Sequence, residues 1–424
     1  MEIALLFAVF LLLMLAGVPV AVSMLLSSIA NITVYGMPET IVAERMLNSI
    51  NSFTLLAVPF FILSGVVMNY GGLTTRMVDV SKAFVGHFRG GTAHVNVVAN
   101  MILAGVSGSA SADCAAIGSV LIPAMKREGY PPGFAVGITA AASCIGPIIP
   151  PSIIMVIYGA MTNLSIGRLF LAGAVPGVLI GFALMGVVVW KAKKLDFPRH
   201  ERLAFAARGM ATVYAIPALV APGIIVGGII SGYYTATEAG VAACVYGLVV
   251  GAFVYHELKW RHIGPIMREA VEMTAVPVFI LASAQVFGWL LTAYGFGSLL
   301  VGWLKALALG PNTMLLLVVL LLFIVGLFLD GLAALLIFVP VFMPLVPAFG
   351  LDHIHFALIV IVTIMIGTIT PPVGLQLYIA SAIGKVSLGE VTVWPFVAAM
   401  ISVVLLMVFV PSIATFLPNL VFGR

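Results

Sequence analysis

The chain has 424 residues, of which 62% are hydrophobic and 8% are charged, against roughly 25% charged in a typical soluble domain. Its net charge is +4 and its mean hydropathy is +1.23. A water-soluble globule of this composition would lack the polar groups to cover its surface. The composition therefore excludes soluble enzymes, nucleic-acid-binding proteins and disordered chains, and it predicts an all-α polytopic membrane protein.

Apolar runs of about 20 residues, long enough to cross a bilayer, follow one another along the chain. Four basic clusters separate some of them, at 76–89, 126–127, 191–208 and 259–268. Because Lys and Arg collect on the cytoplasmic side of membrane proteins, we expect all four clusters there. This requirement predicts about nine spans, with the N-terminus inside and the C-terminus outside. The spans are predicted near 3–33, 52–70, 132–162, 167–190, 210–231, 236–256, 273–292, 354–384 and 391–417.

Two apolar stretches do not fit as crossings. Residues 92–125 lie between two inside clusters and are predicted to form a re-entrant hairpin, and residues 312–346 are predicted to do the same from outside. Segments 73–90 and 257–270 mix basic and apolar residues. They are predicted to be interfacial amphipathic helices, with ordinary loops as the alternative. The three cysteines are interpreted as packing residues inside apolar runs (Cys114, Cys144 and Cys244).

The sequence contains an internal repeat. The residues AVPFFIL at 57–63 recur as AVPVFIL at 275–281, which is 218 residues later. At a spacing of 221 residues, glycines and a double proline also recur: Gly105 with Gly326, Gly129 with Gly350, Gly146 with Gly367, and Pro150-Pro151 with Pro371-Pro372. Five predicted crossings separate the copies, so the second copy is predicted to be inverted. Inverted repeats are typical of secondary transporters, whose site lies where the halves meet.

The tip of the first predicted hairpin, at 105–113, reads GVSGSASAD. A half-helix that begins at mid-membrane presents free N–H groups and the positive end of its dipole, which suits a carboxylate. Serine hydroxyls are hard oxygen ligands of the kind that Na+ prefers. A Gly/Ser-rich contact between helices is the alternative. The residues predicted to bind substrate at this tip are Ser107, Gly108, Ser109 and Ser111.

Two acidic residues accompany the hairpin tips. Asp330 follows the second tip in a long stretch with no other charge, and a carboxylate inside a bilayer commonly marks an ion path. The alternative is that Asp330 caps the second half-helix of its hairpin. Asp113 falls in the first turn of the corresponding half-helix, and capping is the favoured interpretation there.

Paired prolines interrupt two predicted spans, at 146–152 and 367–374. Proline removes a backbone donor and leaves a carbonyl without its helical partner. Free carbonyls at membrane depth are tolerated where they line a cavity or bind an ion. Pro150 and Pro371 are therefore predicted to border the substrate site, with a simple kink as the alternative.

An enzymatic function is not favoured. The residues G-x-S-G at 105–108 match the pattern of rhomboid-type intramembrane serine proteases, but all seven histidines lie in loops or near span ends, away from Ser107. Thr235 and Glu238 have the spacing of a helix capping box. No G-x-x-x-x-G-K-[ST] motif is present, so the chain itself is not expected to hydrolyse ATP.

Seven short motifs form a more specific pattern. They are GVP at 17–19, PFFILSG at 59–65, NYGG at 69–72, SGSA at 107–110, GPIIPPS at 146–152, TATEA at 235–239 and TPPVG at 370–374. In these motifs, and over nearly its whole length, the chain resembles the large membrane subunit of tripartite ATP-independent periplasmic (TRAP) transporters. It departs from the usual family pattern at Ala236, where proline is common.

The resemblance implies Na+-coupled import of a carboxylate-containing solute by elevator-type alternating access, with no organic cofactor. One implied Na+ site uses Ser107, Ser109 and Gly146, and the other uses Gly326, Asp330, Gly367 and Thr370. The implied partners are a small membrane subunit of about four spans, a periplasmic binding protein and the lipid bilayer of the bacterial inner membrane. A stand-alone Na+/dicarboxylate symporter is the alternative. The motifs do not specify which organic acid is carried.

The resemblance also implies a division into scaffold and transport parts. The scaffold would comprise 1–91 and 167–311. The first transport half would be 92–166, with its hairpin at 92–125 and its broken span at 132–162. The second half would be 312–389, with its hairpin at 312–346 and its broken span at 354–384, followed by a C-terminal span in 390–424.

Overall fold

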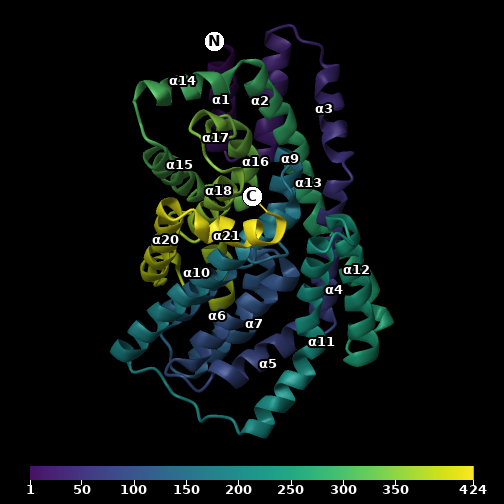
Figure 1. The fold of residues 1–424 in the computed structure, drawn as a ribbon, viewed down its shortest axis with the longest axis vertical. Helices are drawn as coiled ribbons and strands as arrows, with labels where there is room; N and C mark the ends of the chain where they lie inside the picture. The colour runs from purple at the N-terminus through teal and green to yellow at the C-terminus, as the bar shows by residue number, and fades with distance from the viewer. Residues whose placement is uncertain (424) are drawn as a thin grey trace.

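The computed structural model describes residues 1–423, which form α-helices joined by short turns and contain no strand (Figure 1). Shorter helical turns lie at Thr54–Leu56 (η1), Val250–Val254 (η2), Trp260–His262 (η3) and Leu388–Glu390 (η4). The α-helices are α1 (Glu2–Leu15), α2 (Val20–Val34), α3 (Thr40–Ile50), α4 (Ala57–Tyr70), α5 (Leu73–Val85), α6 (Gly91–Ser107), α7 (Ala110–Arg127), α8 (Pro132–Ser143), α9 (Ile153–Thr162), α10 (Ile166–Leu195), α11 (Phe205–Ile230), α12 (Ala236–Val249), α13 (Ile263–Ala293), α14 (Phe296–Ala306), α15 (Pro311–Gly326), α16 (Gly331–Phe342), α17 (Leu345–Ala348), α18 (His353–Gly367), α19 (Leu375–Gly384), α20 (Trp394–Phe409) and α21 (Ser412–Phe422).

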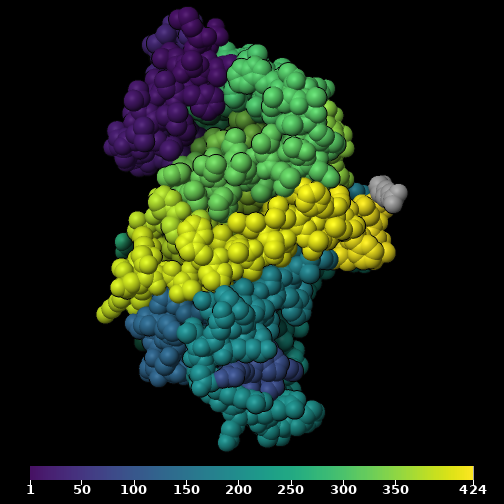
Figure 2. All heavy atoms as spheres, turned by 90° about the vertical axis from the view of Figure 1, so that its left-hand side faces the viewer, coloured from purple at the N-terminus to yellow at the C-terminus, as the bar shows by residue number. Residues whose placement is uncertain are grey.

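The helices pack in two groups. In the first, α4 packs along α12 and α13, α2 and α3 pack on α13, and α11 packs on α5 and α12. In the second, α7 packs on α8 and α19, α15 packs on α18, and α10 packs on α20, α21 and α6. The C-terminal helices, yellow in Figure 2, cross the surface between the second half of the chain in green and the first half in blue and teal.

The internal repeat is present in the structure. The hairpin α6–α7 corresponds to α15–α16, and the broken pair α8–α9 corresponds to α18–α19, at the predicted positions. The copies also exchange packing partners, because α10 contacts α18 while α20 contacts α8. Such an exchange is expected when a two-fold relation links two halves. The amphipathic helices α5 and α14, which follow the two AVP segments, lie at opposite ends of the molecule in Figure 1.

The two hairpins differ in how closely their arms pack. Helices α6 and α7 contact each other along the first hairpin, whereas α15 packs mainly on α18 and α16 mainly on α13. Gly108 lies at the first tip with a left-handed φ of +60°. A Cβ at this position would lie 2.6 Å from the Pro151 carbonyl oxygen, so only glycine lets the tip approach the break between α8 and α9 so closely.

Three predicted elements differ in the structure. The predicted span 3–33 is two helices that fold back on each other: α1 ends before Gly17, α2 starts after Pro19, and the Asn31 side-chain amide donates to the Glu2 carbonyl at 2.9 Å. The predicted amphipathic arm at 257–270 is not separate, because residues 263–270 form the start of the long helix α13. The last predicted span bends by 59° between α20 and α21 at Pro411.

The predicted count of nine crossings is not confirmed. Four helices are long and apolar enough to cross a membrane alone: α10, α11, α12 with the turn that extends it to Val254, and α13 with its preceding turn from Trp260. Two bent pairs, α3–α4 at 64° and α20–α21 at 59°, raise this number to six if each pair is one span. The other apolar helices have 10–17 residues. The number of crossings therefore stays a prediction.

The four basic clusters of the sequence meet in space. Arg76 pairs with Glu257 at 2.7 Å, which joins the first cluster to the fourth. Glu128 lies 3.2 Å from the imidazole of His200, which joins the second cluster to the third. Arg89 pairs with Asp196, which joins the first to the third. One side of the protein therefore carries all four clusters, as the placement of positive charge predicts.

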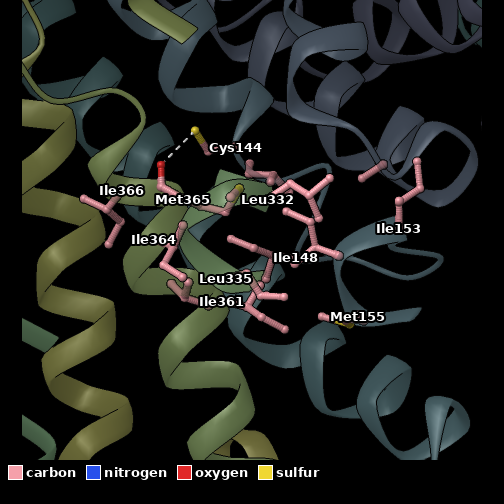
Figure 3. Packing of buried hydrophobic residues seen from close by; sticks show 14 of the residues in the cluster. Cys144, Ile148, Ile153, Met155, Leu332, Leu335, Ile361, Ile364, Met365 and Ile366 are labelled. Carbon is pink, nitrogen blue, oxygen red and sulfur yellow. Dashed lines mark hydrogen bonds between the residues drawn. The ribbon is translucent and has the colours of Figure 1, made fainter. Parts of the chain in front are cut away.

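The core fills the junction between the two halves. Figure 3 shows Ile148, from the break after α8, packed with Leu332 and Leu335 of α16 and with Ile361 and Ile364 of α18. The Cys144 thiol donates to the Met365 carbonyl oxygen at 3.3 Å across the same junction. The three cysteines are buried and free, as predicted for packing residues.

Candidate functional site

The tips of both hairpins border one cavity of about 290 Å³. The first tip contributes Gly108, Ser109 and Ser111, and the second contributes Asp330 and Gly331. A neighbouring cavity of about 420 Å³ extends from the first tip to α4, α5 and α13. Ser109 and Ser111 line both cavities, so the two form adjoining parts of one region.

Four half-helices begin at the smaller cavity. Their first residues all line it: Ala110 of α7, Ile153 of α9, Gly331 of α16 and Leu375 of α19. A helix N-terminus carries a partial positive charge and free N–H groups, and these act within about one turn. Four such ends at one cavity make a favourable place for an anion, although no Lys or Arg from the described residues 1–423 lines either cavity.

Side chains cap three of these four helices. Ser109 accepts a hydrogen bond from the Ala112 amide at 3.4 Å, and Ser152 accepts one from the Met155 amide at 3.2 Å. Asp330 accepts one from the Leu332 amide at 3.1 Å. Capping, which was the alternative interpretation of Asp330, is therefore present in the structure. The predicted capping box of Thr235 and Glu238 is also confirmed at the start of α12.

Asp113 is a buried carboxylate, and one of its two oxygens has no hydrogen-bond partner within residues 1–423. Its Oδ1 accepts a hydrogen bond from the Ser107 hydroxyl. Its Oδ2 has no hydrogen-bond partner within residues 1–423 and faces Gly146, where even a Cβ would collide with it. A buried acidic oxygen is costly unless a hydrogen-bond donor or a cation satisfies it. Ser107, Asp113 and Gly146 therefore form a cluster of oxygen-bearing groups that fits a small cation.

The second predicted ion site is assembled differently. Gly326 and Gly367 touch through their backbones, since a Cβ on Gly326 would lie 2.8 Å from the Cα of Gly367. Asp330 and Thr368 face the smaller cavity. The Thr370 hydroxyl donates to the Ile366 carbonyl at 2.8 Å, so its hydrogen is already used. The structure brings Gly326 and Gly367 together but gives Thr370 a local partner.

The predicted substrate residues fall into two sets. Ser107, Ser109 and Ser111 line the larger cavity, and Gly108 lines the smaller one. Pro150 and Pro371 line neither cavity. Prolines interrupt the spans and so create the helix starts after them, but their rings do not face the space that those starts surround.

Several polar residues at these cavities were not predicted from the sequence. Gln376, in the first turn of α19, donates to the Ser111 hydroxyl at 3.2 Å and has an amide oxygen without a partner within 1–423. The larger cavity also contains Asn69, Thr74 and Glu269 from the first helix group. A polar Gln two residues after Gly374, inside an otherwise apolar predicted span, was the available signal for Gln376.

Comparison with known proteins agrees with this geometry. Residues 7–413 match the family described as "Tripartite ATP-independent periplasmic transporter, DctM component". The chain belongs to this family of TRAP large permease subunits. It is therefore a transporter subunit and not an enzyme.

Two relatives and one solved structure are similar to this permease over most of its length. The sialic acid TRAP transporter large permease protein of Vibrio cholerae is 37% identical over 414 residues, covering 97% of each chain. The isethionate TRAP transporter permease protein of Oleidesulfovibrio alaskensis is 37% identical over 415 residues, covering 97% of this chain and 65% of that relative. The crystal structure of the Alcanivorax borkumensis YdaH transporter superposes with a TM-score of 0.60 at 15% identity, covering 91% of this chain and 88% of that one. This last likeness concerns the fold alone.

Proposed function

We propose that this permease imports an organic anion in symport with Na+. The observation that carries the proposal is the cavity where four helix N-termini meet. Such a site attracts a carboxylate or a sulfonate through backbone N–H groups, serine hydroxyls and the amide of Gln376. The names of the two relatives, a sialic acid and an isethionate transporter, agree with one anionic group as the common feature.

The need for a cation follows from the acidic residues at the same place. Asp113 and Glu269 line the larger cavity and Asp330 lines the smaller one, so an incoming anion meets three carboxylates. A bound Na+ reverses the local sign of the field. We propose Ser107, Asp113 and Gly146 for the first Na+ site, with Ser109 close by, since its amide lies 3.4 Å from the Ser107 hydroxyl. The second site is proposed at Gly326, Gly367 and Asp330, with Thr370 through its carbonyl.

The packing suggests which helices move. We propose that the second helix group, together with α9 and α16, which complete the first broken pair and the second hairpin, carries the cavity past the first group. This division differs from the expected one at α10, α20 and α21, because all three pack on the hairpins or the broken helices. The short arms α5 and α14 then brace the moving group, and the inverted repeat supplies its two end positions.

The remaining parts of a tripartite system complete the proposal. A small membrane subunit of about four spans and a periplasmic solute-binding protein are the proposed partners, in the bacterial inner membrane. The Oleidesulfovibrio permease protein is longer than this chain, which covers 65% of it. The remaining part of that relative is consistent with a small membrane subunit joined to the large one. We propose that the face with the four basic clusters is cytoplasmic. The N-terminus lies beside α14, at the end of the molecule opposite α5 and these clusters (Figure 1), so the cytoplasmic N-terminus expected from the sequence is not proposed; the C-terminus is proposed to be periplasmic.

Reconstitution in liposomes tests the function. The large and small membrane subunits are incorporated together, and the solute-loaded binding protein is added outside with an inward Na+ gradient. Uptake is expected only when the gradient, the small subunit and the binding protein are all present. Equal uptake by the large chain alone would identify a stand-alone symporter, and uptake unchanged by replacing Na+ with choline would refute Na+ coupling.

A further inference from the structure

Two connections between the helix groups lie side by side on the basic face of the protein. Residues 86–90 join α5 to α6, and residues 196–204 join α10 to α11. They form an antiparallel bridge between Arg89 and Arg199, and the Gly90 amide donates to the Pro198 carbonyl at 3.1 Å. A cavity of about 520 Å³ opens beside this bridge, lined by His87, Arg199, His200, Glu201 and Arg202.

Three arginines at or near this cavity have no ion-pair partner within residues 1–423. Within residues 1–423, Arg89 pairs with Asp196 and His200 with Glu128, but Arg199, Arg202 and Arg208 have no ion-pair partner. Among the described residues 1–423, Glu201 is the one carboxylate that lines the cavity. Burial, together with the charges of Arg202, Arg208 and Arg199, lowers the pKa of His87 below its ordinary value, so the guanidinium groups act on the same small volume. Clustered guanidinium groups with few counter-charges favour a bound anion, and phosphate matches their planar donor geometry.

The surroundings of the cavity are apolar and exposed. Trp190 is 47% exposed, and the ammonium groups of Lys194 and Lys191 lie 4.5 and 5.0 Å from the centre of its ring. Further large apolar side chains are exposed on the same segments, namely Phe88, Leu195, Leu203 and Phe205. Aromatic and aliphatic side chains interleaved with Lys and Arg are typical of the boundary between a bilayer and water.

We propose that this cavity binds the phosphate headgroup of an acidic membrane phospholipid. The arginines contact the phosphate, and the exposed apolar residues beside them contact the acyl chains. A free phosphate ion satisfies the arginines but leaves the apolar side chains in water, which is why the lipid is the proposed ligand. The site lies apart from the hairpin cavities and adds a lipid requirement to the proposed transport function.

Lipid titration tests the proposal. The purified full chain is delipidated in detergent, titrated with phosphatidylglycerol and examined by native mass spectrometry. One tightly bound phosphatidylglycerol per chain is expected, with phosphatidylcholine binding much more weakly. Arg199→Gln with Arg202→Gln should weaken phosphatidylglycerol binding by about fivefold for each arginine, or ~25-fold for the pair. Arg202 makes no side-chain hydrogen bond within 1–423, so Arg202→Gln alone repeats the test if the double variant misfolds.

A charge-matched control separates a site from general attraction. Arg261→Gln with Arg268→Gln removes two positive charges from another basic cluster and should leave phosphatidylglycerol affinity unchanged. An equal loss in both double variants refutes a specific site. If inorganic phosphate displaces phosphatidylglycerol at comparable concentration, the cavity binds the ion and the lipid assignment is wrong.

Discussion

Replacing Asp113 with asparagine distinguishes an ion-binding carboxylate from a purely structural one. Asp113 has no exposed surface, and its Oδ2 has no hydrogen-bond partner in residues 1–423. A buried carboxylate without a counter-charge costs several kcal/mol or takes up a proton. Asparagine has nearly the same shape and no charge. Asp113→Asn is therefore expected not to lower the stability of the chain in the absence of Na+.

The effect on Na+ is expected to be large. Two unit charges about 4 Å apart attract by roughly 4 kcal/mol at the effective dielectric constant of a protein. If dehydration of the ion offsets about half of this, ~2 kcal/mol remains, which corresponds to a roughly 30-fold rise in the Na+ concentration for half-maximal uptake. In the wild type, Na+ should raise the melting temperature, and in Asp113→Asn this increase should be lost.

The assay compares melting temperatures in Na+ and in choline, followed by uptake at varied Na+ in liposomes. Asp79→Asn is a matched control, because Asp79 is an exposed carboxylate on α5. It should change neither the Na+ effect on melting nor the Na+ dependence of uptake. If Asp113→Asn lowers the melting temperature equally in both salts and leaves the Na+ dependence of uptake unchanged, Asp113 is a structural residue and not a Na+ ligand.

Three further predictions follow from the hairpins. Gly326→Ala should abolish uptake and lower the melting temperature, because the added Cβ would lie 2.8 Å from the backbone of α18. Gly302→Ala is the control: a Cβ there meets no atom within 4 Å, so neither uptake nor the melting temperature should change. Asp330→Asn should raise the Na+ concentration for half-maximal uptake while docking of the binding protein stays normal. Asparagine is also a good helix cap, so the substitution preserves capping. An unchanged Na+ dependence would therefore leave capping as the role of Asp330. Single cysteines are placed at Ser109 and at Leu329 in a background without native cysteines. Their reaction with an impermeant thiol reagent should depend on Na+ and solute in opposite ways. Identical labelling of both positions from one face would contradict inverted hairpins.

The sequence predicted the local features of the fold well. The hairpin at 92–125, both broken spans and the capping box at Thr235 follow from glycine, proline and serine, which act on backbone within a few residues. The repeat fixed which segments correspond, and it directed attention to Ser109 and Ser111, which do line the site. Motif resemblance also gave the family correctly.

The roles of the two aspartates show where local reasoning stops. Capping was favoured for Asp113 and an ion path for Asp330, yet Asp330 caps α16, while the Asp113 carboxylate accepts the Ser107 hydroxyl and faces Gly146. A cap depends on the next two or three amides, so the sequence suggests it at either position. Whether a carboxylate is buried without a partner depends on a residue 33 positions away, and only the packed structure decides that.

A helical membrane protein with a repeated, interrupted pattern follows from the amino-acid sequence alone, because hydropathy and backbone breaks are properties of short segments. The sequence did not determine the direction of the chain after a break: the residues GVP at 17–19 end a helix, but only packing makes α2 return along α1. The meeting of four helix N-termini at one cavity was likewise decided by the tertiary structure. Each helix start is encoded locally, whereas their convergence arises from the burial of apolar faces between distant segments.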